Sequence, residues 1–329
     1  MKVKVPPFFN KSRDFAAHAV TRLTPTLIKY LADKETRKRF KYLSNNSFID
    51  INEKKSTRSI RIARGNAVYM LDMIRSFDYY FNSTKSIRIK QSGHWRDIVD
   101  FSTPRFQSIS GFLDFPIMCS SLTEPFITAQ QYLDFAKLKP GDVVLDLGSY
   151  SSLTSIAFSK VVKGAGRVIA LEPDPVNYKC CEINIAQHSR SNQLSNIDLI
   201  NAAVSNSNST LKFSSEGAMG SSAADIVGAY RGDVIEVPCL TLSEIARKCR
   251  LARVDFIKMD IEGSEQEVIE SSKEFFEKYR PRIIIEPHMI NRTLTDKAII
   301  SSLTDFGYKC SIIEQSGVNL PLVIGIPRI

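Results

Sequence analysis

Short apolar segments alternate with helical patterns from about residue 124 onward, and this alternation constrains the fold more than any other feature of the chain. The segments 143–147, 167–171, 197–200 and 254–259 are each bounded by polar or glycine-containing stretches. Short apolar strands that alternate with helices are typical of a parallel sheet covered on both faces. The sequence therefore predicts an α/β fold with a doubly wound, mostly parallel, seven-stranded sheet.

Both ends of the chain depart from this alternation. Two last apolar segments, near 308–313 and 321–326, are joined by a short link, which predicts an antiparallel hairpin at the sheet edge. Before residue 124 the chain has short alternating segments with turn residues, after a helical stretch at about 24–42. We therefore expect two domains, a smaller α+β accessory region over 1–123 and the α/β domain over 124–329.

The net charge of +9 is unevenly distributed along the chain. Residues 1–125 contain 22 Lys and Arg against 11 Asp and Glu (+11), whereas residues 126–329 contain 22 against 24 (−2). This asymmetry fits either an anionic partner or a basic helix face that is merely solvated, and we favour the second. The densest basic cluster, at 34–41, lacks the aromatic ladder of a single-strand binder, so no nucleic-acid partner is expected.

Composition and cysteine spacing restrict the class of protein. With 43% apolar and 24% charged residues, fibrous and wholly disordered proteins are excluded. No apolar run approaches the roughly 18–20 residues of a membrane-spanning helix, and the N-terminus lacks the apolar core of a secretory signal. The six cysteines include no C-x-x-C pair and no zinc spacing. We expect a cytoplasmic protein with reduced thiols and without a membrane span.

Polar side chains follow four of the predicted strands where each strand ends. In an open parallel sheet, ligands bind at the carboxyl ends of the strands. One such side chain is explained equally well as a helix cap or a solvated loop residue, but four strand ends at one edge favour a binding site. The residues concerned are Asp146, Gly148, Glu172, Asp260, Glu262, Glu286 and His288.

The second strand end and the first loop indicate the kind of ligand. Glu172 lies 26 residues after Asp146, where a carboxylate accepts the hydroxyl protons of a ribose in nucleotide sites. The loop Gly148-Ser149-Tyr150-Ser151-Ser152 lacks the G-x-G-x-x-G pattern that a pyrophosphate needs. The two features together favour a nucleoside without a pyrophosphate, and S-adenosylmethionine (SAM) is such a molecule.

The residues after the fourth strand carry a family resemblance. The segment Lys258-Met259-Asp260-Ile261-Glu262-Gly263-Ser264-Glu265 resembles the K-x-D-x-E-G-x-E signature of the FkbM family of SAM-dependent methyltransferases. The resemblance covers about residues 124–313 and implies a Rossmann-like class I methyltransferase fold, SAM as cofactor, and methyl transfer as the reaction. Four further segments resemble the family in the same order: 170–175, 201–203, 237–242 and 280–286.

The resemblance also implies which residues hold the cofactor. They are Asp146, Gly148, Ser149, Tyr150, Glu172, Pro173, Asp174, Asn201 and Asp260. The first loop departs from the family's D-x-G-A-N-x-G pattern, because Tyr150 and Ser152 replace the Asn and the second Gly. Serine accommodates positive φ and a close ligand less readily than glycine. We therefore expect this loop either to follow a different path beside the methionine part of SAM or to bind SAM weakly.

Methyl transfer is an in-line displacement in which an enzyme contributes mainly proximity and orientation, and a general base helps when the acceptor is a hydroxyl. We expect Asp260 to lie nearest the reacting groups and Glu262 or His288 to accept the proton. Buried Lys258 is expected to pair with a nearby carboxylate such as Glu265 or Glu286. Asp260, Glu262, Glu286 and His288 also offer oxygen and imidazole ligands to a divalent cation, but their spacing is no recognised metal motif, so no metal ligand is assigned.

The leading interpretation is an O-methyltransferase that acts on a sugar hydroxyl in a polysaccharide, a glycolipid or a glycosylated metabolite. A binding or scaffold protein with a degenerate methyltransferase fold is the alternative, favoured by Tyr150 and Ser152. A nucleic-acid methyltransferase ranks last, because residues 260–263 read D-I-E-G instead of the N/D-P-P-Y/F of base-amine sites. Two roles stay open for residues 1–123: selection of the small-molecule or glycan acceptor, and contact with a second copy in a homo-oligomer.

Overall fold

The structure is a computed structural model that describes residues 42–44, 48–52, 56–62, 73–74, 76–109, 113–123, 126–218, 220–223, 233–291, 293–315 and 320–328. The chain divides into two compact units, Met1–Pro116 with Ser121–Thr123 and Ile117–Ser120 with Glu124–Ile329. The helix predicted over 24–42 lies outside the described residues, except for Tyr42, which begins a strand. No helix in the described part of the chain is long and apolar enough to span a membrane.

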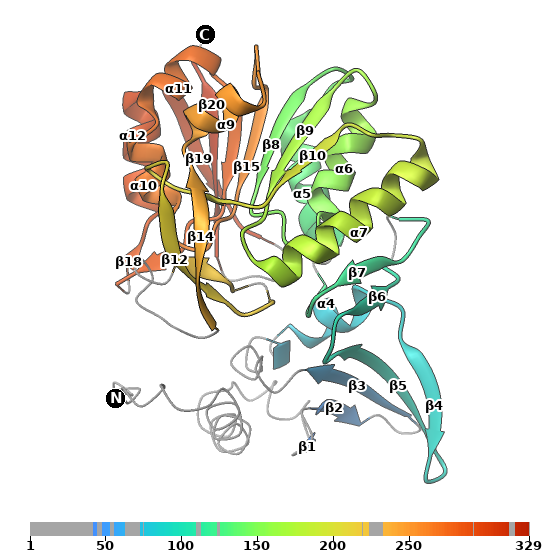
Figure 1. The fold of residues 1–329 in the computed structure, drawn as a ribbon. Coiled ribbons are helices and arrows are strands. Elements are labelled where there is room, and N and C mark those ends of the chain that lie inside the picture. Colours follow the sequence, from blue (N-terminus) through green and yellow to red (C-terminus); the bar gives the residue numbers. More distant parts are fainter. Residues whose placement is uncertain are drawn as a thin grey trace. The chain divides into compact units, whose positions relative to one another are not determined.

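The larger unit contains a seven-stranded sheet of order β10-β9-β8-β15-β16-β20-β19 (Figure 1). All neighbours from β10 to β16 pair in parallel. The chain enters at the centre with β8, moves outward through β9 to β10, and returns to the other side of β8 with β15. The strand order therefore reverses between β8 and β15, which is where open α/β sheets bind ligands. These strands are β8 (Val143–Leu147), β9 (Arg167–Leu171), β10 (Ile197–Ile200), β15 (Phe256–Met259) and β16 (Arg282–Ile285).

The last two strands close the sheet as an antiparallel pair. β20 (Leu322–Pro327) pairs antiparallel with both β16 and β19 (Tyr308–Ile313), so β19 forms the edge. The predicted doubly wound sheet and its C-terminal antiparallel hairpin are confirmed.

Alternate residues of the central strands enter two different hydrophobic cores. Leu145 and Ile257 point into one core, while their neighbours Val144 and Phe256 point into the other. Successive strand residues face opposite sides of a sheet, so strands covered on both sides must be apolar throughout, as the sequence shows. The first core is covered by α10 (Glu265–Glu270), α11 (Lys273–Tyr279) and α12 (Asp296–Asp305), and the second by α5 (Phe126–Ala136) and α6 (Leu153–Val162).

Smaller elements complete this unit. A four-stranded sheet of order β11-β14-β12-β13 lies between β10 and β15 in the sequence. Its strands are β11 (Ala203–Val204), β12 (Thr210–Ser215), β13 (Ser222–Ala223) and β14 (Asp233–Leu240), and α9 (Leu242–Lys248) follows. The remaining elements are β7 (Ile117–Cys119), α7 (Pro175–Asn192), β17 (Met289–Ile290) and β18 (Thr293–Leu294).

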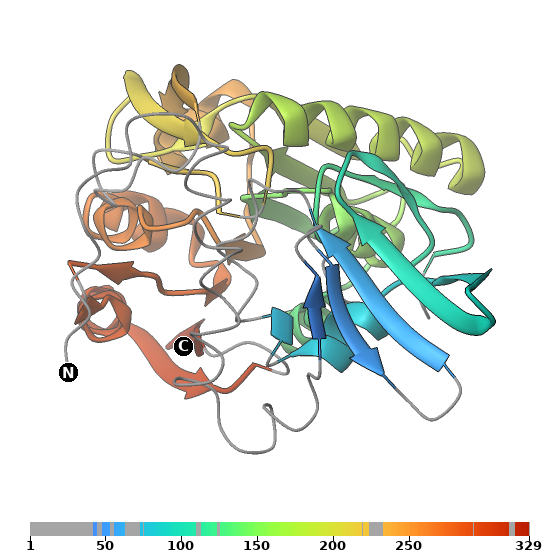
Figure 2. The same cartoon turned by 90° about the horizontal axis from the view of Figure 1, so that it is seen from below.

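The smaller unit contains a five-stranded sheet of order β1-β2-β3-β5-β4 (Figure 2). Residues 92–93 turn the chain between β4 and β5, and both have positive φ. The short alternating segments noted before residue 124 thus include strands and a tight turn. The elements are β1 (Tyr42–Ser44), β2 (Phe48–Asn52), β3 (Ser56–Ile62), α4 (Phe77–Asn82), β4 (Ile87–Gln91), β5 (His94–Phe101) and β6 (Arg105–Gln107).

Candidate functional site

The loop after β8 forms the first wall of the candidate site. Gly148, Tyr150 and Ser152 all have left-handed backbone, with φ of 79°, 49° and 59°. The N–H groups of Gly148 and Ser149 donate to the carbonyl of Leu171 at 3.1 and 2.9 Å, which ties the loop to the end of β9. The loop thus makes left-handed turns at two non-glycine positions, each at a cost of about 1–2 kcal/mol. The loop lacks the second glycine of the family pattern, and its backbone instead takes left-handed φ angles at Tyr150 and Ser152.

Glu172, at the end of β9, is buried against this loop. Its two carboxylate oxygens accept hydrogen bonds from the backbone N–H groups of Tyr150 (2.8 Å) and Asp174 (2.9 Å), and Asn177 Nδ2 lies 3.5 Å away. Burial raises its pKa to about 8. The side chain is therefore at the place predicted for a ribose-binding carboxylate, and it also fixes the backbone of the neighbouring loop.

Asp146 lies inside the sheet edge, where it is fully buried. Its Oδ2 accepts hydrogen bonds from the hydroxyls of Thr154 (2.6 Å) and Ser155 (2.5 Å), while Oδ1 lies 3.6 Å from Lys258 Nζ. Lys258 also donates to the carbonyl oxygen of Gly148 at 2.6 Å and lies 3.7 Å from Asp260 Oδ2. Lys258 thus pairs with nearby carboxylates, as expected, but these belong to Asp146 and Asp260 and are not the Glu265 or Glu286 named as examples.

The other predicted cofactor residues support the loop or lie beside it. Asp174 caps α7 by accepting from the N–H groups of residues 176 and 177, and it also accepts from Ser215, Gly217 and Ser221. Asn201 donates to the carbonyl oxygens of Glu172 (2.8 Å) and Pro173 (3.3 Å). Asp174 is fully buried and Asn201 is exposed, so only Asn201 of these two presents its side chain to solvent.

Asp260, Glu262 and His288, the predicted catalytic residues, lie together after β15 and β16. Nε2 of His288 is 3.8 Å from Asp260 Oδ1, 3.6 Å from Glu262 Oε1 and 4.0 Å from Glu286 Oε1. Its Nδ1 makes a 2.9 Å hydrogen bond with Oε1 of Glu265, which is fully buried. The structure therefore brings the predicted acidic and imidazole side chains into one cluster.

The pKa values of this cluster are shifted because its ionisable side chains are largely buried and lie close to one another. Burial acts to lower the pKa of His288, but the carboxylates of Glu262 and Glu265 raise it well above its ordinary value. Burial and the nearby Asp260 raise the pKa of Glu286. Burial acts to raise the pKa of Glu265 too, yet the His288 ring and its hydrogen bonds hold that pKa below its usual value.

Two polar residues that sequence reasoning missed, Asn177 and Asn184, support the site. Asn184, fully buried in α7, donates to the carbonyl oxygens of Ser151 (2.9 Å) and Met118 (2.7 Å). Asn177 contacts Glu172, and Glu265 accepts from the N–H groups of residues 261 and 263. Asn177 and Asn184 are seven residues apart and so lie on one helix face. In the sequence, this spacing of two asparagines on one helix face was the signal that could have identified them as site residues.

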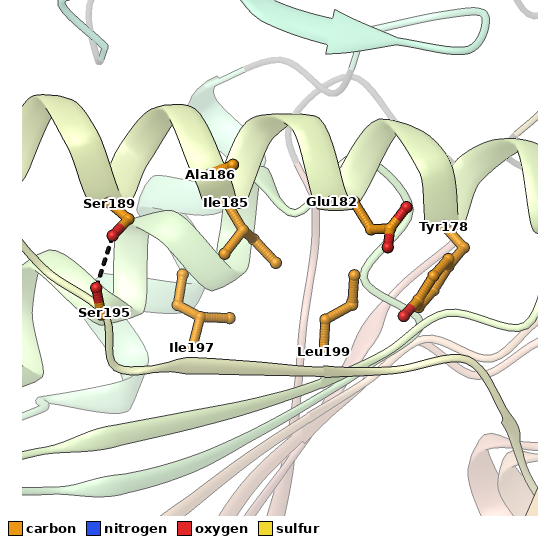
Figure 3. Close-up of a pocket in the computed structure, with 8 residues that line it drawn as sticks. All are labelled: Tyr178, Glu182, Ile185, Ala186, Ser189, Ser195, Ile197 and Leu199. Atoms are coloured by element: carbon orange, nitrogen blue, oxygen red, sulfur yellow. Dashed lines mark hydrogen bonds between the residues drawn. The ribbon is translucent and has the colours of Figure 1, made fainter.

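A groove of about 340 Å³ lies elsewhere, between α7 and the edge strand β10 (Figure 3). Tyr178 and Glu182 of α7 face Ile197 and Leu199 of β10 across it. None of the predicted site residues lines this groove, so it carries no part of the functional argument.

The family model described as the methyltransferase FkbM domain matches residues 142–310, which include every predicted site residue. The chain belongs to the FkbM methyltransferase family. The matched FkbM region begins just before β8 and ends within β19. A search of curated proteins finds no match.

Several solved structures are similar to this FkbM chain. FkbM methyltransferase from Methylobacillus flagellatus is 18% identical, covers 57% of this chain and 44% of its own, and has a TM-score of 0.41. Precorrin-6y C5,15-methyltransferase from Geobacter metallireducens is 15% identical, with coverage of 63% and 90% and a TM-score of 0.40. Aeropyrum pernix fibrillarin, in complex with natively bound SAM, is 13% identical, with coverage of 73% and 82% and a TM-score of 0.38. The chain thus spans less than half of the Methylobacillus protein.

Family membership implies SAM as the cofactor, and the residues present fit this molecule. SAM carries a positively charged sulfonium and an ammonium group, and the edge beside the loop presents the carboxylates of Asp260, Glu262 and Glu286. Within the described part of the chain, the Ser151 hydroxyl is buried without a hydrogen-bond partner. Acidic side chains and an unsatisfied loop hydroxyl suit a cationic ligand that also carries hydroxyl groups.

Glu172 predicts a pH dependence of stability. Its pKa is about 8 in the folded protein against an ordinary 4.5, so the folded state binds more protons between these values and the free energy of unfolding falls as pH rises. Between about pH 6 and pH 8 we expect the wild type to lose about 2–3 kcal/mol more than Glu172→Gln. Urea unfolding at a series of pH values measures this difference. Glu182→Gln, an exposed change on α7, should keep the wild-type slope; equal slopes in all three proteins would contradict the prediction.

Proposed function

We propose that this FkbM protein transfers the methyl group of SAM to a hydroxyl group of a sugar-containing acceptor. The observation that carries the proposal is the contact between the loop after β8 and the acidic cluster after β15. A Cβ atom on Gly148 would lie only 1.8 Å from the carbonyl oxygen of Asp260, so the two backbones are in direct contact. The loop residues that would hold the cofactor therefore lie directly beside Asp260.

The side chains of the cluster divide the work of such a reaction. SAM supplies an activated methyl group, whose bond to sulfur breaks as the acceptor oxygen bonds to the methyl carbon. Asp260 lies nearest to the loop and orients the reacting groups. Glu262 is the most exposed carboxylate of the cluster, with 27% of its side chain accessible, and accepts the proton of the acceptor hydroxyl. His288, held by Glu265, positions the carboxylates around it.

The sugar acceptor is inferred from the family resemblance. A carboxylate-rich edge suits an acceptor that offers several hydroxyl donors, because ionised carboxylates accept hydrogen bonds strongly. This supports a polysaccharide, a glycolipid or a glycosylated metabolite as the acceptor class.

A binding protein without catalysis is the second candidate. Tyr150 is buried, with 7% of its surface accessible, and the Glu172 oxygens already accept hydrogen bonds from the chain's own backbone. A Glu172 carboxylate that is already occupied by the chain's own backbone supports a site with reduced affinity for SAM.

Thermal unfolding separates the two candidates. A ligand at 100 times its Kd stabilises a folded protein by about 2.7 kcal/mol, so saturating SAM or S-adenosylhomocysteine should raise the melting temperature of the wild-type chain. Glu172→Ala should lose this increase relative to its own ligand-free melting temperature, while the exposed control Glu182→Ala should retain it. If neither ligand shifts the wild-type transition, the methyltransferase proposal fails and the binding protein remains. A full shift in Glu172→Ala would instead show that the ribose lies elsewhere.

A further inference from the structure

The imidazole of His288 is held in the orientation that metal-binding histidines adopt. Its Nδ1 makes a 2.9 Å hydrogen bond with Glu265, a fully buried carboxylate that is itself fixed by the N–H groups of residues 261 and 263. Histidine ligands commonly donate one ring N–H to such a carboxylate, which fixes the ring and makes the other nitrogen a better ligand. The fixed ring therefore directs Nε2 toward the carboxylates of Asp260, Glu262 and Glu286, and a metal ion bound there releases the proton of Nε2 to solvent.

Nε2 and the surrounding oxygens are spaced as ligands of one ion. One ligand atom each from Asp260, Glu286 and His288 lie within 4.8 Å of one another. Two ligands on opposite sides of an ion, each at roughly 2.0–2.2 Å, are roughly 4.0–4.4 Å apart. Small side-chain movements are therefore enough for all three atoms to reach a shared cation. The three side chains are 13–22% exposed, which leaves a route for the ion and room for further ligands.

A buried polar atom beside the cluster independently indicates a missing partner. Gln315 is 8% exposed, and its Nε2 donates to Glu286 Oε2 at 2.7 Å. Its Oε1 is buried and has no hydrogen-bond partner within the described part of the chain. An amide oxygen left unsatisfied next to a carboxylate calls for a hydrogen-bond donor, and water bound to a cation supplies one.

We propose that Asp260, Glu286 and His288 form a binding site for one divalent transition-metal ion, with Mn²⁺ as its probe. One imidazole and two carboxylates favour such an ion over Mg²⁺ or Ca²⁺, which prefer oxygen ligands alone. Three protein ligands leave positions open for water or for an oxygen of the acceptor. This consequence for the acceptor rests on the proposed methyl transfer, whereas metal binding itself does not.

The test is a titration of the tag-free chain with Mn²⁺ in the absence of SAM. Electron paramagnetic resonance measures the concentration of free Mn²⁺ at each step of the titration. We expect one bound Mn²⁺ per chain. In His288→Gln and in Glu286→Gln the Kd should rise at least about tenfold, as loss of a ligand or its support does. Glu274→Gln, which removes an exposed carboxylate on α11, is the matched control and should bind like the wild type.

Each outcome decides the proposal. No binding by the wild-type chain at about 1 mM Mn²⁺, the range of a very weak site, overturns it, and so does equal binding by all four proteins. Circular dichroism checks that each variant is folded. If one of the two ligand variants does not fold, Asp260→Asn is tested in its place. A chain that responds to SAM but not to Mn²⁺ contradicts the metal site alone, whereas the reverse result contradicts the proposed methyl transfer alone.

Discussion

Replacing Lys258 with methionine is expected to lower the free energy of unfolding by about 3–5 kcal/mol, the usual cost of removing one partner from a buried ion pair. Only 1% of the Lys258 side chain is exposed, and its Nζ lies 3.6 Å from Asp146 and 3.7 Å from Asp260. Asp146 is fully buried, so its charge would remain without a compensating cation. Methionine keeps most of the volume, so the loss reports charge and hydrogen bonding more than packing. Urea unfolding measures it.

The matched control is Lys179→Met, which removes the lysine of a 2.9 Å ion pair with Glu182. The Lys179 side chain is 71% exposed, and exposed pairs contribute little, typically about 0–1 kcal/mol. A similar small effect for both variants would show that Lys258 does not stabilise the junction between β8 and β15.

Gly148→Ala is expected to destabilise the protein by about 2–5 kcal/mol. The added Cβ would lie 1.8 Å from the carbonyl oxygen of Asp260, and both groups are backbone, so one of the two segments must move. Overpacking costs about 1–3 kcal/mol, and the φ of 79° adds about 1–2 kcal/mol for a residue with a Cβ. The displacement would separate the loop from the acidic cluster. We therefore expect the melting-temperature shift with SAM to disappear as well.

Two other glycines separate the contributions to this effect. Gly141 has a φ of 94° but open space around its Cβ position, so Gly141→Ala should show the backbone cost alone, about 1–2 kcal/mol. Gly164 has neither a positive φ nor a neighbour within 4 Å, and Gly164→Ala should be close to neutral. If Gly148→Ala is no worse than Gly141→Ala, the close approach of the loop to Asp260 is not rigid.

The sequence was sufficient for the fold of the larger unit, because periodicity carries that information. Strands covered on both faces must be apolar at every position, and the glycine and proline punctuation between them sets the boundaries of the elements. The resemblance of residues 258–265 to the family signature implies the class I methyltransferase fold, and the carboxyl ends of its parallel strands place Glu172, Asp260 and His288 at one edge. The domain boundary at 123/124 and the roles of the site residues stay predictions.

Only the tertiary structure decided which side chain each polar residue meets. Lys258 contacts Asp146 on the neighbouring strand β8 and Gly148 in the loop after it, whereas Glu265 and Glu286 had been expected as partners. The fixed hydrogen bond between Glu265 and His288 joins residues 23 positions apart, and no local pattern encodes it. Periodicity determines the face and the edge on which a residue lies. The partner depends on register and on side-chain direction between strands, and these exist only once the strands are packed together.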